Sequence, residues 1–233
     1  MGPKYEFTGE TKNWGDSTLH RIRRLSDGKL GGWIESEDNL SQDGRCWVDD
    51  NAMVYDDAKV YGNALIYDDA LVNDHAQVYG DAQVYGEAEV HGDACIEEYA
   101  DVSDGAAIMG CAHVSGEAII YGNAIVWDDA KIYDNAKVFG NIEVAENAQV
   151  YGNACVFEYA RVGGNAQVCG NAKVYGNVKI SSGDYIDEEF SCNEDLLKNS
   201  ETKKVVQDFI YKVDDSNKLT TQTEYDFIDE FFT

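Results

Sequence analysis

From Val48 to Ile180 the chain repeats one six-residue phrase without an insertion or a deletion. Every sixth residue is aliphatic, and the residue four positions later is Ala except at Ile142 and Val178. The two residues before each Ala are usually drawn from Gly, Asn and Asp. A period of six fits neither an α-helix of 3.6 residues per turn nor a hairpin meander, so the repeat predicts a solenoid.

Each phrase predicts a short strand followed by a turn. Ala and the aliphatic residue are two positions apart, which places both side chains on the same side of the strand. We expect these two series to fill the core and their neighbours to face solvent. The Gly, Asn and Asp positions must turn the chain, because these residues tolerate positive φ. Three such corners close a triangular coil of 18 residues.

The phrase resembles the hexapeptide repeat of left-handed parallel β-helices, in which an aliphatic residue is followed four positions later by a small one. The segment that leads into the repeat contains Leu30-Gly31-Gly32-Trp33-Ile34-Glu35-Ser36, Asn39-Leu40-Ser41 and Cys46-Trp47-Val48. This segment looks like that of uncharacterised bacterial and phage proteins with Gly-Asn-Ala-x-Val repeats. The resemblance implies the fold and its left-handed coil, and it implies little about activity.

Three parts follow from this pattern. Residues 1–47 predict an N-terminal β cap, because short β-like runs alternate with Gly and Asp turns. Residues 48–180 predict a left-handed parallel β-helix of roughly seven coils. Residues 181–233 predict an acidic connector and a short C-terminal helical tail, in which Ser200 and Thr223 are candidate helix caps.

Charge is concentrated on the repeat and the tail. The net charge of −26 divides into −1 over residues 1–47, −16 over 48–180 and −9 over 181–233. A chain this acidic is not expected to bind nucleic acid or an anionic membrane directly, and it points to basic partners or to solubility. Spread over a rod of about 35 Å, the charge of the repeat is one per ~2.2 Å, close to the ~1.7 Å of duplex DNA.

The corners hold most of these acids, and one corner edge carries the candidate partner-binding site. Asp is also favoured in turns and keeps a β-rich rod soluble, which is the alternative explanation. The residues of this predicted acidic edge are Asp56, Asp57, Asp74, Asp93, Asp128, Asp129 and Glu146.

A column of aromatic residues, one per coil, is predicted along one outward face. Stacking within the column stabilises a sheet, but its length exceeds the apolar surface that a monomer usually exposes. We therefore expect a homo-oligomer formed through this face. The residues of the predicted oligomer face are Tyr67, Tyr85, Tyr121, Phe139, Phe157 and Tyr175.

No catalytic, metal or cofactor site is expected. The six cysteines lack Cys-x-x-Cys spacing, and none lies one coil from another, so we interpret them as reduced thiols of a cytoplasmic protein. Many hexapeptide-repeat proteins are acyltransferases with a catalytic histidine, but His75, His91 and His113 have no partner that spacing establishes. No apolar run is long enough to span a membrane.

These features favour a non-catalytic acidic interaction protein. The most specific hypothesis is a nucleic-acid mimic that inhibits a nucleic-acid-binding host protein such as a defence nuclease, and a phage origin is compatible with it. An acyltransferase and a structural or polymer-forming rod are the alternatives. Salt-sensitive binding that DNA competes away would distinguish mimicry from acyl transfer.

Overall fold

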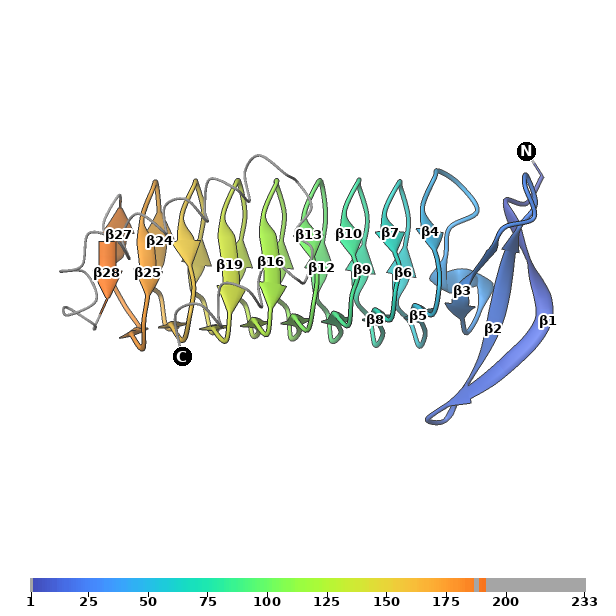
Figure 1. Cartoon of the computed structure of the whole chain (residues 1–233), viewed down its shortest axis with the longest axis horizontal. Coiled ribbons are helices and arrows are strands. Elements are labelled where there is room, and N and C mark those ends of the chain that lie inside the picture. The colour runs from blue at the N-terminus through green and yellow to red at the C-terminus, as the bar shows by residue number, and fades with distance from the viewer. Residues whose placement is uncertain (1, 187–188, 192–233) are drawn as a thin grey trace, which may run out of the picture. The chain divides into compact units, whose positions relative to one another are not determined.

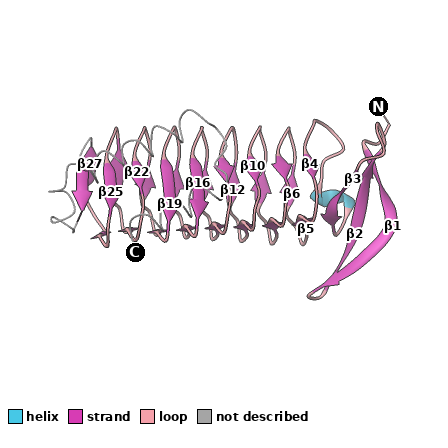
Figure 2. Ribbon diagram, in the orientation of Figure 1, coloured by secondary structure: helices cyan, strands magenta, loops and turns pink. Residues whose placement is uncertain are grey.

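The computed structural model describes residues 2–186 and 189–191, and the residues up to Ser191 form one compact unit. This unit is an elongated parallel β-solenoid with three sheets (Figure 1). A short 3-10 helix, η1 (Glu37–Asn39), is the helical element among the described residues (Figure 2). None of these residues forms a helix long and apolar enough to cross a bilayer.

Consecutive strands belong to different sheets, so each sheet gains one strand per coil. Sheet 1 contains β1 (Tyr5–Trp14), β2 (Ser17–Arg24), β3 (Leu30–Ile34), β5 (Met53–Val54), β8 (Leu71–Val72), β11 (Glu89–Val90), β14 (Ala107–Ile108), β17 (Ile125–Val126), β20 (Glu143–Val144), β23 (Arg161–Val162) and β26 (Lys179–Ile180). Sheet 2 contains β4 (Trp47–Val48), β7 (Leu65–Ile66), β10 (Gln83–Val84), β13 (Asp101–Val102), β16 (Ile119–Gly122), β19 (Lys137–Gly140), β22 (Cys155–Val156), β25 (Lys173–Tyr175) and β28 (Glu189–Ser191). Sheet 3 contains β6 (Lys59–Val60), β9 (Gln77–Val78), β12 (Cys95–Ile96), β15 (His113–Val114), β18 (Lys131–Ile132), β21 (Gln149–Val150), β24 (Gln167–Cys169) and β27 (Asp184–Ile186).

The core is built as the repeat predicts. The Ala and aliphatic series are buried along the whole solenoid and form one continuous hydrophobic cluster. Backbone hydrogen bonds join each coil to the next, as from Leu65 N–H to the Ala82 carbonyl at 2.9 Å and from Tyr67 N–H to the Val84 carbonyl at 3.1 Å. Each coil therefore satisfies its strand backbone through its two neighbours, which explains why a missing residue would break the register.

The first turn position of each corner has positive φ. Where that position is not Gly it is Asp or Glu in every case recorded in the described chain, with φ between 50° and 65°. Gly is required where coils approach most closely, since a Cβ on Gly80 would lie 2.6 Å from the Glu98 backbone nitrogen. The first turn position therefore requires residues that adopt positive φ, and Asp and Glu occupy this position in the coils where Gly does not.

The N-terminal hairpin of β1 and β2 extends sheet 1, because β2 pairs with β3 and β3 pairs in parallel with β5. The approach of β3 to the first coil leaves no room for side chains at Gly31 and Gly32. A Cβ on Gly31 would lie 2.6 Å from the Trp47 ring, and one on Gly32 would lie 2.6 Å from the Ala52 carbonyl oxygen. The Gly31-Gly32 pair thus allows β3 to pack directly against the first coil of the solenoid.

The solenoid is longer than the seven coils predicted, since sheet 2 alone has nine strands. The predicted end at Ile180 is too early. Strand β27 pairs with β24, and β28 pairs with β25, which adds two strands inside the segment predicted as a connector. Tyr185 takes the position opposite Val168 at a spacing of 17 residues, and this loss of the 18-residue spacing hides the strand from a pattern of period six. The predicted helices after Ser200 lie outside the described residues.

Candidate functional site

The predicted acidic edge lies at the corners that connect sheet 1 to sheet 3. Five of its residues are exposed, namely Asp56, Asp57, Asp93, Asp129 and Glu146, and the other two are half-buried. The Asp57 side chain is 80% exposed, which leaves its carboxylate almost fully hydrated. The edge is interrupted in one coil, where Gly110 and Cys111 occupy the corner.

Some corner acids also bond to the neighbouring coil. Asp74 lies at the first turn position, and its Oδ2 accepts a hydrogen bond of 2.9 Å from Gly92 N–H. The same contact recurs at the other corners, from Gly116 N–H to Glu98 at 2.7 Å and from Gly152 N–H to Asp134 at 3.1 Å. These carboxylates satisfy a backbone donor that the strand ladders leave free, so they have a structural role that spacing did not reveal.

Acids at the second turn position have no such contact. Within the described part of the chain, no Lys or Arg forms an ion pair with a member of the acidic edge. Its close basic neighbours are histidines, with His75 Nδ1 at 3.4 Å from Asp57 and His91 Nδ1 at 3.7 Å from Asp74. The edge therefore presents uncompensated negative charge when those histidines are neutral.

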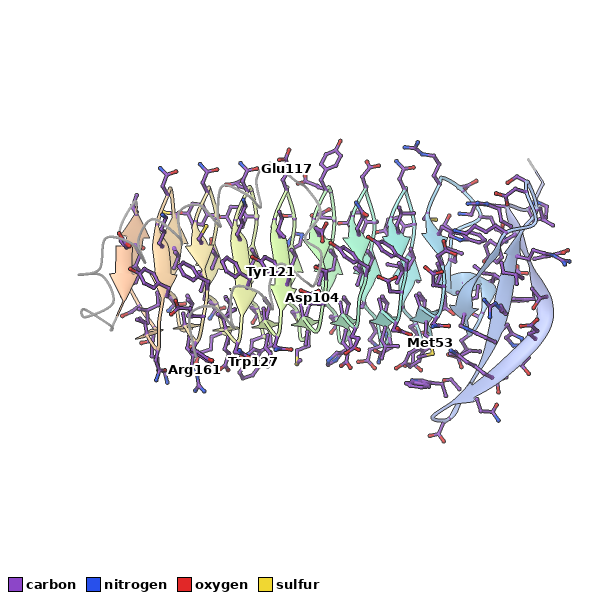
Figure 3. All side chains as sticks on the ribbon, in the orientation of Figure 1. Met53, Asp104, Glu117, Tyr121, Trp127 and Arg161 are labelled. Atoms are coloured by element: carbon purple, nitrogen blue, oxygen red, sulfur yellow. The ribbon has the colours of Figure 1, made fainter. Side chains whose placement is uncertain are left out.

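The other two corner edges are acidic as well. Figure 3 shows Glu117 on one edge of the solenoid, away from Trp127 and Arg161. Glu117 lines a shallow groove together with Glu98, Tyr99 and Asp134. Sequence reasoning did not select this groove, and the signal that could have found it is the exposed Tyr99, which replaces the usual Asn or Asp of the second turn position.

The predicted oligomer face is partly inaccessible. Tyr121, Phe139, Phe157 and Tyr175 are nearly fully buried within the single chain, whereas Tyr67 and Tyr85 are half-buried. The rings stack at spacings such as 4.8 Å between Tyr121 and Phe139, but stacking alone does not account for their burial, since Tyr67 and Tyr85 stack at 4.7 Å. The expectation that the whole column is exposed is therefore wrong for its C-terminal part.

One carboxyl on the same face has an unusual environment. Asp101 is half-buried in sheet 2, and one of its oxygens lacks a hydrogen-bond partner in the described structure. Burial raises the pKa of Asp101 to about 6, although a hydrogen bond from Tyr85 lowers it. Asp101 is therefore the acid of the solenoid that we expect to titrate closest to neutrality.

Sheet 3 brings together three residues that sequence reasoning kept apart. Cys95, Glu97 and His113 place one ligand atom each within 4.8 Å of one another. Spacing assigns them to neighbouring positions of one face, since Cys95 and His113 are 18 residues apart and Glu97 is two residues from Cys95, but it does not give the distance between their ligand atoms. A hydrogen bond from Tyr79 lowers the pKa of Glu97, and burial raises the pKa of Cys95.

The fold and these surfaces define a class, a parallel β-solenoid with acidic corners and an unbroken aliphatic core. Comparison with protein families places one part of the chain more specifically. Residues 148–164, which span β21 to β23, match a family described as YdcK Beta solenoid repeat. A comparison with curated proteins found no match.

Proposed function

We propose that this chain is a non-catalytic acidic interaction protein that binds a basic partner as a nucleic-acid mimic. A nucleic-acid-binding host protein such as a defence nuclease is the partner class that the charge favours, and binding would inhibit it. The observation that carries the proposal is the acidic edge, of whose seven acids five are exposed, and none has a Lys or Arg partner among the described residues. The reduced cysteines expected from the sequence favour a cytoplasmic location.

The spacing of the edge supports mimicry of one nucleic-acid strand. Stacked rings one coil apart are separated by 4.7 Å for Tyr67 and Tyr85 and by 4.8 Å for Tyr133 and Tyr151, which measures the rise per coil. The six corners of the edge are separated by five rises, or about 24 Å, so its seven acids average one charge per ~3.4 Å. A single strand of duplex DNA also has one charge per ~3.4 Å along the helix axis.

The rigidity of the edge also supports the proposal. Asp74 and the first-turn acids are attached to corners whose backbone is bonded to the neighbouring coils. A row of charges held by the backbone loses less conformational entropy on binding than a flexible acidic segment would. A basic groove that follows a phosphate backbone would therefore meet a pre-formed row of carboxylates.

The test removes charge from the edge without removing the turn residues. In the edge variant, Asp56, Asp57, Asp74, Asp128 and Asp129 are all changed to Asn, which tolerates the same corner conformation. Proteins captured from a bacterial lysate by the wild-type chain are eluted with duplex DNA, and the affinity of the eluted partner is measured at low and high salt. We expect the edge variant to lose affinity by more than about tenfold at low salt and by less at high salt.

A matched control neutralises the same number of corner acids on the edge between sheet 2 and sheet 1. Its five changes are Asp50→Asn, Asp68→Asn, Asp69→Asn, Glu87→Gln and Asp104→Asn. This control removes equal charge from equivalent turn positions, so it separates a specific edge from general repulsion. Equal binding by both variants, or full affinity in the edge variant, would show that the acids only keep the rod soluble.

We also propose that the chain forms a homo-oligomer through the accessible part of the aromatic face. Tyr67 and Tyr85 stack with ring centroids 4.7 Å apart and remain half-buried, and Leu65 beside them is 38% exposed. Light scattering tests this proposal on the wild type and on a Tyr67→Glu/Tyr85→Glu variant. A wild-type mass of 25.8 kDa at tens of micromolar would contradict it.

The relationship of this chain to a particular group of β-solenoid proteins is also a proposal. We infer that the chain is related to the left-handed hexapeptide-repeat proteins of bacteria and phages, on the strength of its Gly-Asn-Ala-x-Val phrases and the Gly31-Gly32-Trp33-Ile34 segment. A phage origin is compatible with an inhibitor of a host nuclease. A crystal structure that shows a right-handed coil would contradict this relationship.

A further inference from the structure

The outward face of sheet 3 repeats one side-chain interaction. A Tyr hydroxyl donates to a Gln oxygen of the next coil, as from Tyr61 to Gln77 at 3.1 Å and from Tyr133 to Gln149 at 3.2 Å. Tyr151 and Gln167 form the same pair. This pair occurs on both sides of the middle coils of sheet 3, where other residues take its positions.

The replacement occurs on β12 and β15, where Cys95, Glu97 and His113 lie. Cys95 and His113 are direct partners in the parallel pairing of these two strands. Glu97 follows on the same side of the chain as Cys95, and His113 Nε2 lies 2.7 Å from Glu97 Oε1. The ligand atoms of all three residues lie within 4.8 Å of one another, and the strand ladders hold their backbones in place.

We propose that Cys95 Sγ, Glu97 Oε1 and His113 Nε2 bind one Zn²⁺ ion on the face of sheet 3. A thiolate, an imidazole and a carboxylate together are the donors that Zn²⁺ prefers, whereas Mg²⁺ and Ca²⁺ take oxygen ligands. Three protein ligands leave the fourth tetrahedral position for water. That position is open to solvent, since the His113 and Glu97 side chains are 38% and 23% exposed.

Binding requires side-chain movements on the order of 1 Å, because the Cys95 sulfur, now within 4.8 Å of the other two ligand atoms, must lie about 3.5 Å from each in a tetrahedral site. Two ligands that each lie about 2.0 Å from a tetrahedral metal are about 3.3 Å apart, so the bonded Nε2 and Oε1 atoms must separate by ~0.6 Å. Binding would release the proton of the Cys95 thiol, and a neutral His113 would carry its proton on Nδ1 so that the Nε2 lone pair is free for the metal. The partly exposed side chains leave room for this adjustment.

Tyr79 provides the outer contact of the site. Its hydroxyl accepts a weak hydrogen bond of 3.6 Å from the Cys95 thiol and lies beside the Glu97 carboxylate. A donor to a ligating carboxylate orients it, and removal of such a donor commonly weakens metal binding by about 10–100-fold. The surrounding charge acts in the same direction, because a net charge of −26 raises the local concentration of cations.

The experiment uses the full chain, reduced and stripped of metal with a chelator. Zn²⁺ affinity is measured by calorimetry and by competition with a chromophoric chelator, and Co²⁺ replaces Zn²⁺ as an optical probe of thiolate ligation. We expect one equivalent of metal to bind and Co²⁺ to show a thiolate charge-transfer band. Cys95→Ser should abolish the band, and Cys95→Ser, Glu97→Gln and His113→Gln should each weaken binding by more than about tenfold.

Matched controls change the same residue types away from the site. Cys111→Ser, Glu117→Gln and His91→Gln should leave the affinity within about twofold, and Cys192→Ser should do the same. Circular dichroism checks that every variant keeps its β-structure. Tyr79→Phe keeps the ring that stacks on Tyr61 at 4.6 Å, so a loss of about tenfold in that variant reports the lost hydroxyl and not a lost packing contact.

Three outcomes would overturn the proposal. They are the absence of stoichiometric Zn²⁺ binding, a Co²⁺ complex without a thiolate band, and a thiolate band that persists in Cys95→Ser. None of these outcomes bears on the acidic edge, because the edge variant keeps all three ligands. Failure of the metal site and failure of the mimic are therefore separable.

Discussion

The interior and the corners of this solenoid share one period but tolerate change differently. Interior positions are Ala or aliphatic in almost every phrase and are fully buried. Corner positions alternate between Gly and acids, and many corner side chains are exposed. The interior must fill a constant volume in each coil, whereas a corner must only permit a backbone angle and keep its polar groups bonded or hydrated. Functional variation is therefore confined to the corners and the outward face of each strand.

The largest predicted effect comes from overfilling the interior. Ala124 is fully buried in mid-solenoid, so Ala124→Phe should destabilise the chain by about 3 kcal/mol or more. Lys131 is exposed in the following phrase, and Lys131→Phe should change stability by less than about 0.5 kcal/mol. Thermal or denaturant unfolding of both variants tests the comparison, and equal midpoints would refute the assignment of inward and outward positions.

A smaller loss is expected at a close corner. Gly80 has a φ of +73°, and an added Cβ would lie 2.6 Å from the Glu98 nitrogen, so Gly80→Ala should cost about 2–3 kcal/mol. Gly28 has nearly the same φ of +74° with nothing within 4 Å of an added Cβ. Gly28→Ala should cost about 1 kcal/mol, because it carries the strain without the contact. An equal loss of stability in the two variants, measured from their denaturant midpoints, would show that the close approach of coils at Gly80 does not destabilise Gly80→Ala.

Asp101 is half-buried, so it is neither an interior residue nor an exposed corner residue, and its carboxyl should make the stability of the chain depend on pH. Its pKa is about 6 in the folded chain, above the value of about 3.9 for an unfolded Asp. The protonated carboxyl is therefore fully favourable to folding below about pH 4, and its contribution is lost as pH rises through 6. Asp101→Asn should remove about 1–2 kcal/mol of this dependence and be more stable than the wild type at pH 7.

Unfolding of the wild type and Asp101→Asn between pH 4 and pH 8 checks this sign. Other acids of the chain titrate in the same range, so the difference between the two proteins is the informative quantity. A difference that does not change with pH would show that Asp101 ionises normally.

The smallest effect distinguishes the two turn positions of a corner. Asp134 has a φ of +58°, and its carboxylate accepts a hydrogen bond of 3.1 Å from Gly152 N–H. Asp134→Ala loses this bond and should cost about 1 kcal/mol. Asp134→Asn should cost less, since Asn keeps an acceptor and tolerates the angle. Asp129 lies at a second turn position and is exposed, and Asp129→Ala should be neutral within about 0.5 kcal/mol. Chemical unfolding that ranks Asp129→Ala with Asp134→Ala would contradict the structural role of the first-turn acids.

The positions of the acidic edge were predictable from the sequence for the same reason as the fold, namely the six-residue repeat. The acidic edge follows directly from the repeat, because residues 18 apart must stack at the same corner. The hydrogen bond from Gly92 N–H to Asp74 was not predictable, since it depends on how far a carboxylate reaches along the corner. The burial of Tyr121 and Phe157 was likewise hidden, because a column position states direction but not what surrounds the ring.

The sequence by itself determined the buried ladder, the three sheets and the corners, because each coil of a solenoid contacts only its neighbours and one period specifies all of them. Only the tertiary structure decided that the solenoid continues past Ile180, since β27 and β28 pair at spacings of 17 and 16 residues that no longer match the repeat. It also brought Cys95, Glu97 and His113 together. Periodicity assigns such residues to columns, but the distance between their ligand atoms depends on rotamers and on strand register, which arise only when the coils stack.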